Sequence, residues 1–103
     1  MTKGRVLLVE DEAGIRLGIR RFLESKGFEV GEAETCRGAV DSFVARPADA
    51  VLLDNLLPDG NGIDLLTRLK DIAPAVPVVV ITAHGSIEAA VRWPKPMPRP
   101  TAS

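Results

Sequence analysis

Carboxylate and hydroxyl side chains follow short apolar runs at three places in the chain. Glu10 and Asp11 follow the first run, Asp54 follows the second and Thr82 follows the third. Carboxylates held close together repel one another, and a hard divalent cation with oxygen ligands removes that repulsion. No His or Cys joins this set, so the residue types favour Mg²⁺ or Mn²⁺ over zinc. The chemistry predicted here is binding of a divalent metal ion, if the fold brings the three places together.

The three apolar runs have the composition of strands that are buried on both faces. Residues 6–9, 50–53 and 78–81 contain only Val, Leu, Ile and Ala, which is typical of a parallel sheet covered by helices. A shorter strand is predicted over residues 28–30, and it brings no comparable polar residue. Because ligands of parallel α/β sheets bind beyond the carboxyl ends of the strands, we expect the carboxylates and Thr82 to converge at that edge.

Helical periodicity alternates with these strands and predicts an α/β protein. Four helices are expected: residues 12–26, a helix capped by Thr35 that ends before Pro47, residues 63–72, and residues 87–91 after the cap Ser86. The first helix is expected to turn an apolar face inward and a basic face outward. Its inward residues are Ile15, Ile19, Phe22 and Leu23, and its outward residues are Arg16, Arg20, Arg21 and Glu24. The inward residues of the next two helices are Ala39, Val40, Phe43 and Val44, and then Ile63, Leu65, Leu66, Leu69 and Ile72.

Size, charge and composition exclude several classes of function. The chain has 103 residues, 46% of them apolar, which suits one domain with a core. A formal charge of −1 and an aromatic content of 4% disfavour binding to nucleic acid. No apolar run is long enough for a membrane span or a signal peptide, so a cytoplasmic protein without a membrane partner is expected. The one cysteine, Cys36, is expected to be a small residue near a helix start with no chemical role.

Three segments of the chain resemble the receiver domains of response regulators in two-component signalling. They are residues 7–12, 52–62 and 80–86, and the third is similar to receivers of the NtrC-like transcriptional activators. The resemblance covers residues 4 to about 91. It implies a flavodoxin-like, doubly wound parallel sheet, here truncated to about four strands in the order 2-1-3-4 with four helices.

The resemblance also implies a role for each candidate residue. Asp54 would accept a phosphoryl group from a phosphohistidine of a sensor histidine kinase. Glu10, Asp11, Asp54 and the backbone carbonyl of Leu56 would hold Mg²⁺ or Mn²⁺, which neutralises charge on the transferred group. Thr82 would bond a phosphoryl oxygen and bias the loop that follows it. No catalytic residue beyond the phosphoacceptor is expected, so the chain is not predicted to be an enzyme.

The sequence departs from the receiver pattern after residue 92. Residues 93–103 are rich in proline and are predicted to be an extended or disordered tail, whereas residues 1–92 are predicted to be a truncated receiver domain. Receivers continue into a fifth strand, a Lys-Pro dipeptide and a fifth helix. Lys95 comes only thirteen residues after Thr82 and is not assigned the family's lysine role, so phosphorylation is expected to persist with an impaired output.

Two other functions compete with the receiver interpretation. The chain could be a non-catalytic module that keeps the receiver core and associates with itself, because residues 78–81 would form an exposed sheet edge. We therefore expect a homodimer through that edge. A phosphohydrolase with an aspartyl nucleophile would share the acidic residues, but no second acid–base group is placed beside Asp54.

Overall fold

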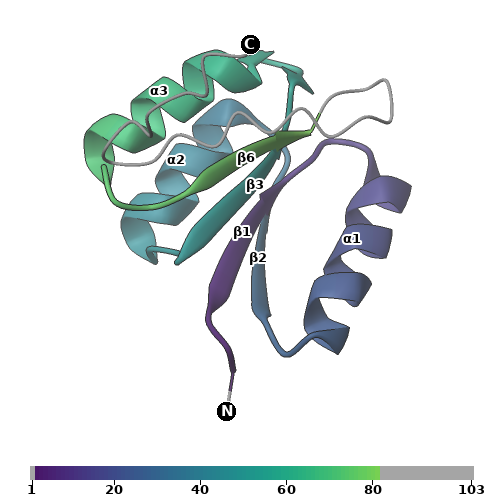
Figure 1. The fold of residues 1–103 in the computed structure, drawn as a ribbon. Helices are drawn as coiled ribbons and strands as arrows, with labels where there is room; N and C mark the ends of the chain where they lie inside the picture. The colour runs from purple at the N-terminus through teal and green to yellow at the C-terminus, as the bar shows by residue number, and fades with distance from the viewer. Residues whose placement is uncertain (1, 82–103) are drawn as a thin grey trace, which may run out of the picture.

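The computed structural model describes residues 2–81 of the chain, and its centre is a parallel four-stranded sheet (Figure 1). The strand order is β2-β1-β3-β6, which confirms the predicted order. The strands are β1 Arg5–Val9, β2 Glu29–Ala33, β3 Ala50–Asp54 and β6 Val78–Ile81. The predicted α/β fold class is confirmed as well.

Three described helices cover the two faces of the sheet. They are α1 Ala13–Ser25, α2 Cys36–Ala45 and α3 Gly62–Ile72. In Figure 1, α2 and α3 lie together on one face, and α1 lies on the other. Within residues 2–81 no helix is long and apolar enough to cross a membrane. The predictions for Thr82, the helix at 87–91, Lys95 and the proline-rich tail concern residues outside the described part of the chain and stay predictions.

The main core lies on the face covered by α2 and α3. Side chains alternate between the faces of a strand, so Leu7 and Val9 of β1 point to this face and Val6 and Leu8 point to the α1 face. The parallel register places Leu7 beside Val51, and both are 1% exposed. The buried cluster on this face consists of Leu7, Val9, Ala33, Cys36, Ala39, Phe43, Ala48, Val51, Leu53, Leu57, Leu65, Leu66, Leu69, Val78 and Val80.

Side-chain caps fix where the helices begin. The hydroxyl of Thr35 accepts a hydrogen bond from the Gly38 N–H at 2.9 Å, which confirms the predicted cap of α2. Asn61 accepts from the Asp64 N–H at 2.8 Å at the start of α3. Each cap follows a loop at the carboxyl edge of the sheet, so the loops that carry the candidate site have defined ends.

The predicted orientation of α1 is confirmed only in part. Ile19 and Leu23, expected to face inward, are half-buried, and Arg21 and Glu24, expected to face outward, are exposed. No residue of this helix is buried, and the expected inward residues Ile15 and Phe22 are 53% and 59% exposed. Arg16, expected to face outward, turns toward β2, and only 15% of its side chain is exposed. The inward position of Arg16 has a physical reason: β2 carries Glu32, and both Arg16 and Arg20 form ion pairs with that carboxylate.

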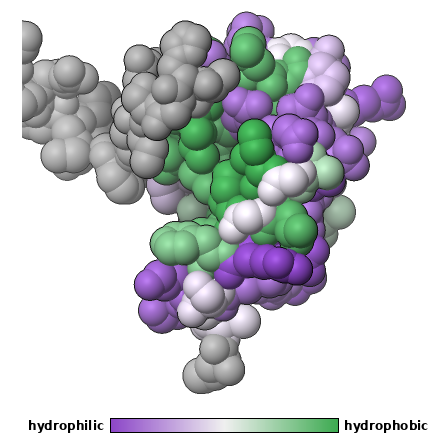
Figure 2. Space-filling model, turned by 90° about the vertical axis from the view of Figure 1, so that its right-hand side faces the viewer, coloured by the Kyte–Doolittle hydropathy of each residue, from purple (hydrophilic) through white to green (hydrophobic). Residues whose placement is uncertain are grey.

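Figure 2 views the molecule from the side on which α1 lies in Figure 1, and apolar surface gathers in the middle of this face. The exposed large apolar side chains of α1 include Ile15, Leu17 and Phe22. On the opposite face the predicted inward residues are mostly buried. The exceptions are Val40, which is half-buried against the core, and three residues in the first or last turns of their helices that are 45% to 62% exposed, Val44, Ile63 and Ile72.

The loop after Asp54 contains a small hairpin that the sequence did not predict. Strands β4, Leu56–Leu57, and β5, Gly60–Asn61, pair antiparallel. Gly62 then starts α3 at a position where an added Cβ would lie 2.9 Å from the Asp54 carbonyl oxygen. Only glycine allows this close approach, so the start of α3 packs directly against the end of β3.

Candidate metal and phosphoacceptor site

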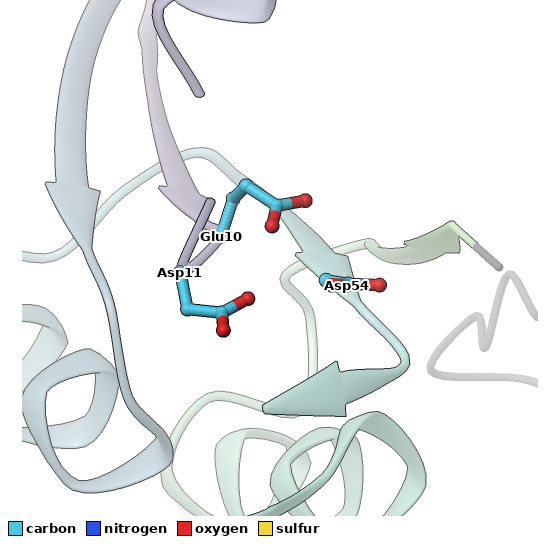
Figure 3. A group of neighbouring side chains, drawn as sticks. All are labelled: Glu10, Asp11 and Asp54. Atoms are coloured by element: carbon cyan, nitrogen blue, oxygen red, sulfur yellow. The ribbon is translucent and has the colours of Figure 1, made fainter. Parts of the chain in front are cut away.

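Three carboxylates meet at the carboxyl edge of the sheet (Figure 3). Glu10 and Asp11 follow β1, and Asp54 is the last residue of β3. One oxygen of each residue lies within 4.8 Å of an oxygen of both others. Neighbouring parallel strands β1 and β3 pair from Val6 with Ala50 to Val9 with Leu53, and this register brings the two strand ends side by side.

Glu10 is the buried member of the group, at 7% exposure. One of its carboxylate oxygens accepts a hydrogen bond from the Glu12 N–H at 3.0 Å. Burial raises the pKa of Glu10 above its usual value, the Glu12 N–H opposes that shift, and the charges of Asp54 and Asp11 add to it. Crowded carboxylates of this kind are stabilised by a cation placed among them.

The backbone around Asp54 is held by contacts with its neighbours. The N–H of Asn55 donates to the carbonyl of Ile81 at 3.0 Å, and the N–H of Gly62 donates to the carbonyl of Asn55 at 2.8 Å. These bonds connect the end of β3 to β6 on one side and to α3 on the other. The backbone directly after Asp54 is therefore held by two further elements.

The hairpin beyond Asp54 is anchored by a carboxylate that sequence reasoning missed. Asp59 lies between β4 and β5 and accepts hydrogen bonds from the N–H groups of Cys36 at 2.7 Å and Arg37 at 3.1 Å. Those N–H groups belong to the first turn of α2, where a negative charge is favoured. These bonds lower the pKa of Asp59 below its usual value.

Arg16 is a second residue that sequence reasoning missed. Its Nη1 donates to the backbone carbonyl of Glu10 at 2.7 Å, and its Nε donates to Glu32 at 2.9 Å. The predicted second strand, residues 28–30, is shorter than the observed β2, which runs on to Ala33 and carries Glu32. As expected, no residue of this strand belongs to the acidic group. An unbroken apolar run marked the other three strands of the sheet, whereas Glu29, Gly31 and Glu32 interrupt such a run in β2.

The donor set fits a hard divalent cation. All three side chains offer carboxylate oxygens, they come from two adjacent strand ends, and one of them is buried with a raised pKa. Mg²⁺ is commonly held in proteins by one or two carboxylates and several waters. Leu56, whose carbonyl was expected to add a ligand, begins β4 two residues after Asp54. Thr82 lies outside the described residues.

A doubly wound parallel sheet with an acidic group at the carboxyl ends of β1 and β3 places the protein among the flavodoxin-like α/β proteins. Residues 6–95 match the family described as "Response regulator receiver domain", and the chain belongs to this family. The resemblance seen in the sequence is thus confirmed.

Sequence relatives agree with this assignment. The chain is 42% identical to the "Regulatory protein LuxO" of Vibrio vulnificus over 84 residues, which cover 82% of this chain and 18% of the relative. It is 42% identical to the "Phosphate regulon transcriptional regulatory protein PhoB" of Escherichia coli over 90 residues, 85% of this chain and 39% of the relative. The chain therefore spans less than half the length of either relative.

Solved structures give the same result for the fold. The non-phosphorylated HemR receiver domain from Leptospira biflexa superposes with a TM-score of 0.75 at 33% identity, covering 92% of this chain and 84% of that one. NtrX from Brucella abortus, in complex with ADP, superposes with a TM-score of 0.76 at 32% identity, covering 82% of this chain and 20% of that one.

Proposed function

We propose that the chain is a phosphoacceptor receiver domain in which Asp54 accepts a phosphoryl group and Glu10 and Asp11 complete a divalent metal site. The observation that carries this proposal is the meeting of the three carboxylates within 4.8 Å at the carboxyl edge of the sheet. Membership in the receiver family supports the same assignment.

The proposed reaction transfers a phosphoryl group from a phosphorylated donor to Asp54. An oxygen of Asp54 bonds to phosphorus while the bond from phosphorus to the donor breaks, and the donor leaves with that bonding pair. Mg²⁺, when bound, neutralises charge that develops on the phosphoryl oxygens. Glu10 and Asp11 hold the metal, and the backbone carbonyl of Leu56 is the proposed further ligand. No other residue is proposed to act on the phosphoryl group chemically, so the chain is not proposed to be an enzyme.

The natural donor in this proposal is a phosphohistidine of a sensor histidine kinase. Thr82 is proposed to bond a phosphoryl oxygen once Asp54 is modified. Because the chain covers only 18% of LuxO and 39% of PhoB, the outputs of those whole proteins are not assigned to it.

Acetyl phosphate tests the proposal without requiring the kinase. Purified protein is incubated with acetyl phosphate and Mg²⁺, and its intact mass is measured by mass spectrometry. We expect a gain of one phosphoryl group, which disappears with EDTA and in Asp54→Asn. Asp71→Asn is the matched control, because Asp71 is an exposed carboxylate in the last turn of α3, whereas the first turn of α3 adjoins Asp54. This variant should gain the phosphoryl group as the wild type does. A wild-type protein with unchanged mass would argue against the assignment.

The fourth strand supports a proposal about assembly. Within residues 2–81, β6 pairs with β3 and has no described strand on its other side. Val79 is partly exposed there, as is Ile81. Unpaired strand edges bind other strands, so we propose a homodimer in which the β6 strands of two copies lie side by side about a twofold axis.

Sedimentation velocity measures this assembly directly. A dimer is expected for the wild type, and Val79→Lys should dissociate it or precipitate the protein. The control is Val44→Lys, an equally large change at an exposed position on α2, which should leave the dimer intact. A folded, monodisperse wild-type monomer at tens of micromolar would contradict the proposed dimer and leave the phosphoacceptor role untouched.

A further inference from the structure

The guanidinium of Arg16 joins three elements beside the acidic group. Arg16 belongs to α1, its Nη1 donates to the backbone carbonyl of Glu10 at 2.7 Å, and its Nε donates to Glu32 of β2 at 2.9 Å. Only 15% of its side chain is exposed. The planar guanidinium presents its donors in a fixed fork, so binding at one end orients the other.

The carbonyl that Arg16 binds belongs to the peptide unit between Glu10 and Asp11. On the strand side of that unit, the Glu10 N–H donates to the carbonyl of Ala33 at 3.0 Å. On the helix side, the Glu12 N–H donates to the Glu10 carboxylate at 3.0 Å. The hydrogen bond from Arg16 fixes the carbonyl of this peptide unit and therefore the orientation of the peptide plane. That orientation determines the direction in which the Asp11 side chain points.

We propose that Arg16 is a positioning residue for the metal site. It fixes the Glu10–Asp11 peptide against β2, so that the carboxylates of Glu10 and Asp11 can bind the same metal ion as Asp54. The inference rests on the proposed function, because it assigns Arg16 a purpose in the same metal site. It goes beyond that function by naming a residue that touches neither metal nor phosphoryl group.

Electrostatics alone predicts the opposite effect of removing Arg16. A positive charge near three carboxylates repels a divalent cation, so the loss of that charge would strengthen Mg²⁺ binding. A positioning role predicts that the loss weakens binding, because outer-shell partners that orient metal ligands commonly change affinity by about tenfold to a hundredfold. Whether Mg²⁺ affinity rises or falls in the Arg16 variant therefore distinguishes electrostatic repulsion from a positioning role.

Arg20 offers a matched control on the same helix. It binds the same carboxylate, with Nη1 to Glu32 at 2.7 Å, and it also pairs with Glu24 at 3.2 Å. It lies one helical turn farther along α1 than Arg16. Arg20→Gln thus removes the same charge and disturbs the same Glu32 while the bond to the Glu10 carbonyl remains.

Calorimetric titration with MgCl₂ compares the wild type with Arg16→Gln, Arg16→Lys and Arg20→Gln, after circular dichroism and thermal unfolding have shown that each variant is folded. We expect Arg16→Gln to weaken Mg²⁺ binding by roughly tenfold or more. Arg16→Lys should fall between Arg16→Gln and the wild type, because one ammonium cannot reproduce the fork. Arg20→Gln should bind at least as tightly as the wild type.

A second titration with CaCl₂ separates positioning from general destabilisation. Mg²⁺ demands near-octahedral geometry, whereas Ca²⁺ accepts flexible coordination. If Arg16 positions ligands, Arg16→Gln should lose more affinity for Mg²⁺ than for Ca²⁺. Equal losses for the two ions would contradict the positioning role.

The remaining outcomes are also decisive. If Arg16→Gln fails to fold, Arg16→Lys carries the test, because it keeps the charge and alters only the fork. Folded Arg16 variants that bind Mg²⁺ as tightly as the wild type would overturn the inference alone. A wild type that binds no Mg²⁺ would contradict the metal site of the proposed function, and the positioning role would fall with it.

Discussion

The two faces of the sheet are covered by different kinds of contact. On the face of α2 and α3, the helices are held by apolar side chains such as Phe43 and Leu65, which are 2% and 0% exposed. On the other face, α1 buries no residue completely and is connected to β2 by ion pairs from Arg16 and Arg20 to one carboxylate. Hydrophobic burial dominates the first face, whereas on the second face, where Val6 and Leu8 of the sheet are also buried, ion pairs add to it.

This difference bears on the site because each face supports a different part of it. Asp54 lies at the end of β3, where Gly62 of α3 packs closely against its backbone. Glu10 and Asp11 lie in the turn from β1 into α1, where Arg16 binds the backbone. Asp54, the proposed phosphoacceptor, is thus backed by the face of α2 and α3, whereas Glu10 and Asp11, its proposed metal-binding partners, adjoin the polar contacts of α1.

The largest contrast is expected from the same substitution on the two faces. Phe43→Ala should lower the free energy of unfolding by about 3–5 kcal/mol, because it leaves a cavity in the core. Phe22→Ala should cost no more than about 1 kcal/mol, since its ring is 59% exposed and its added contact is with the Lys26 ammonium at 5.5 Å. Urea unfolding followed by circular dichroism measures both.

A milder variant protects this comparison against complete unfolding. Single domains have limited stability, so Phe43→Ala could leave no folded protein to titrate. Phe43→Leu removes less volume and should still cost more than Phe22→Leu. Equal costs at the two positions would show that the α1 face is packed as tightly as the α2 and α3 face.

The next effect concerns the contact between α3 and the end of β3. A Cβ added in Gly62→Ala would lie 2.6 Å from the Leu53 side chain and 2.9 Å from the Asp54 carbonyl oxygen. Because a backbone atom cannot move aside cheaply, we expect a loss of about 1–3 kcal/mol of stability. The displaced strand end should also weaken Mg²⁺ binding in calorimetry. Unchanged stability would mean that α3 can shift away from β3 without cost.

Asp59 provides a smaller effect that depends on pH. Its pKa is lowered in the folded protein by the Cys36 and Arg37 N–H groups, so its contribution to stability is fully present above the unfolded-state pKa and is lost as pH falls through the folded-state pKa. Asp59→Ala should therefore lower the melting temperature at neutral pH. The difference in melting temperature between wild type and Asp59→Ala should begin to shrink below about pH 3.8, the usual pKa of this carboxyl group.

Thermal unfolding monitored by circular dichroism at neutral and acidic pH tests this cap. Asp71→Ala is the control, because it removes an exposed carboxylate from α3, and it should show a much smaller gap at neutral pH. A gap for Asp59→Ala that stayed constant down to acidic pH would mean that the methylene and carboxyl carbon atoms, not the charge, stabilise α2.

Local patterns in the sequence were sufficient to predict three strands of the main sheet and the acidic group. The three apolar runs correspond to β1, β3 and β6, and the polar residues that follow β1 and β3 meet because parallel strands end at one edge. The cap at Thr35 was also predictable, since its partner is three residues away. Strand order was known only from the resemblance to receiver domains.

Contacts between distant elements were not predictable in the same way. The bond from Asp59 to the start of α2 joins residues 23 positions apart, and the pair of Arg16 and Glu32 spans 16 positions. A helical pattern gives the spacing of apolar residues but not the rotation of the helix about its axis. In α1, Ile19 and Leu23 of the predicted stripe are half-buried, Ile15 and Phe22 are exposed, and Arg16 is turned toward β2 by its ion pair with Glu32.

The smallest predicted effect tests how open the α1 face is. Gly18 lies in the middle of α1, and a Cβ built on it meets nothing within 4 Å. Alanine stabilises an open helix position relative to glycine by roughly 0.5–1 kcal/mol, so Gly18→Ala should raise the free energy of unfolding by about that amount, the reverse in sign of Gly62→Ala. Urea unfolding at several protein concentrations makes the measurement. A destabilising Gly18→Ala whose effect grew with protein concentration would show that a second copy packs against α1, which would place the dimer contact on this face and not at the edge of β6.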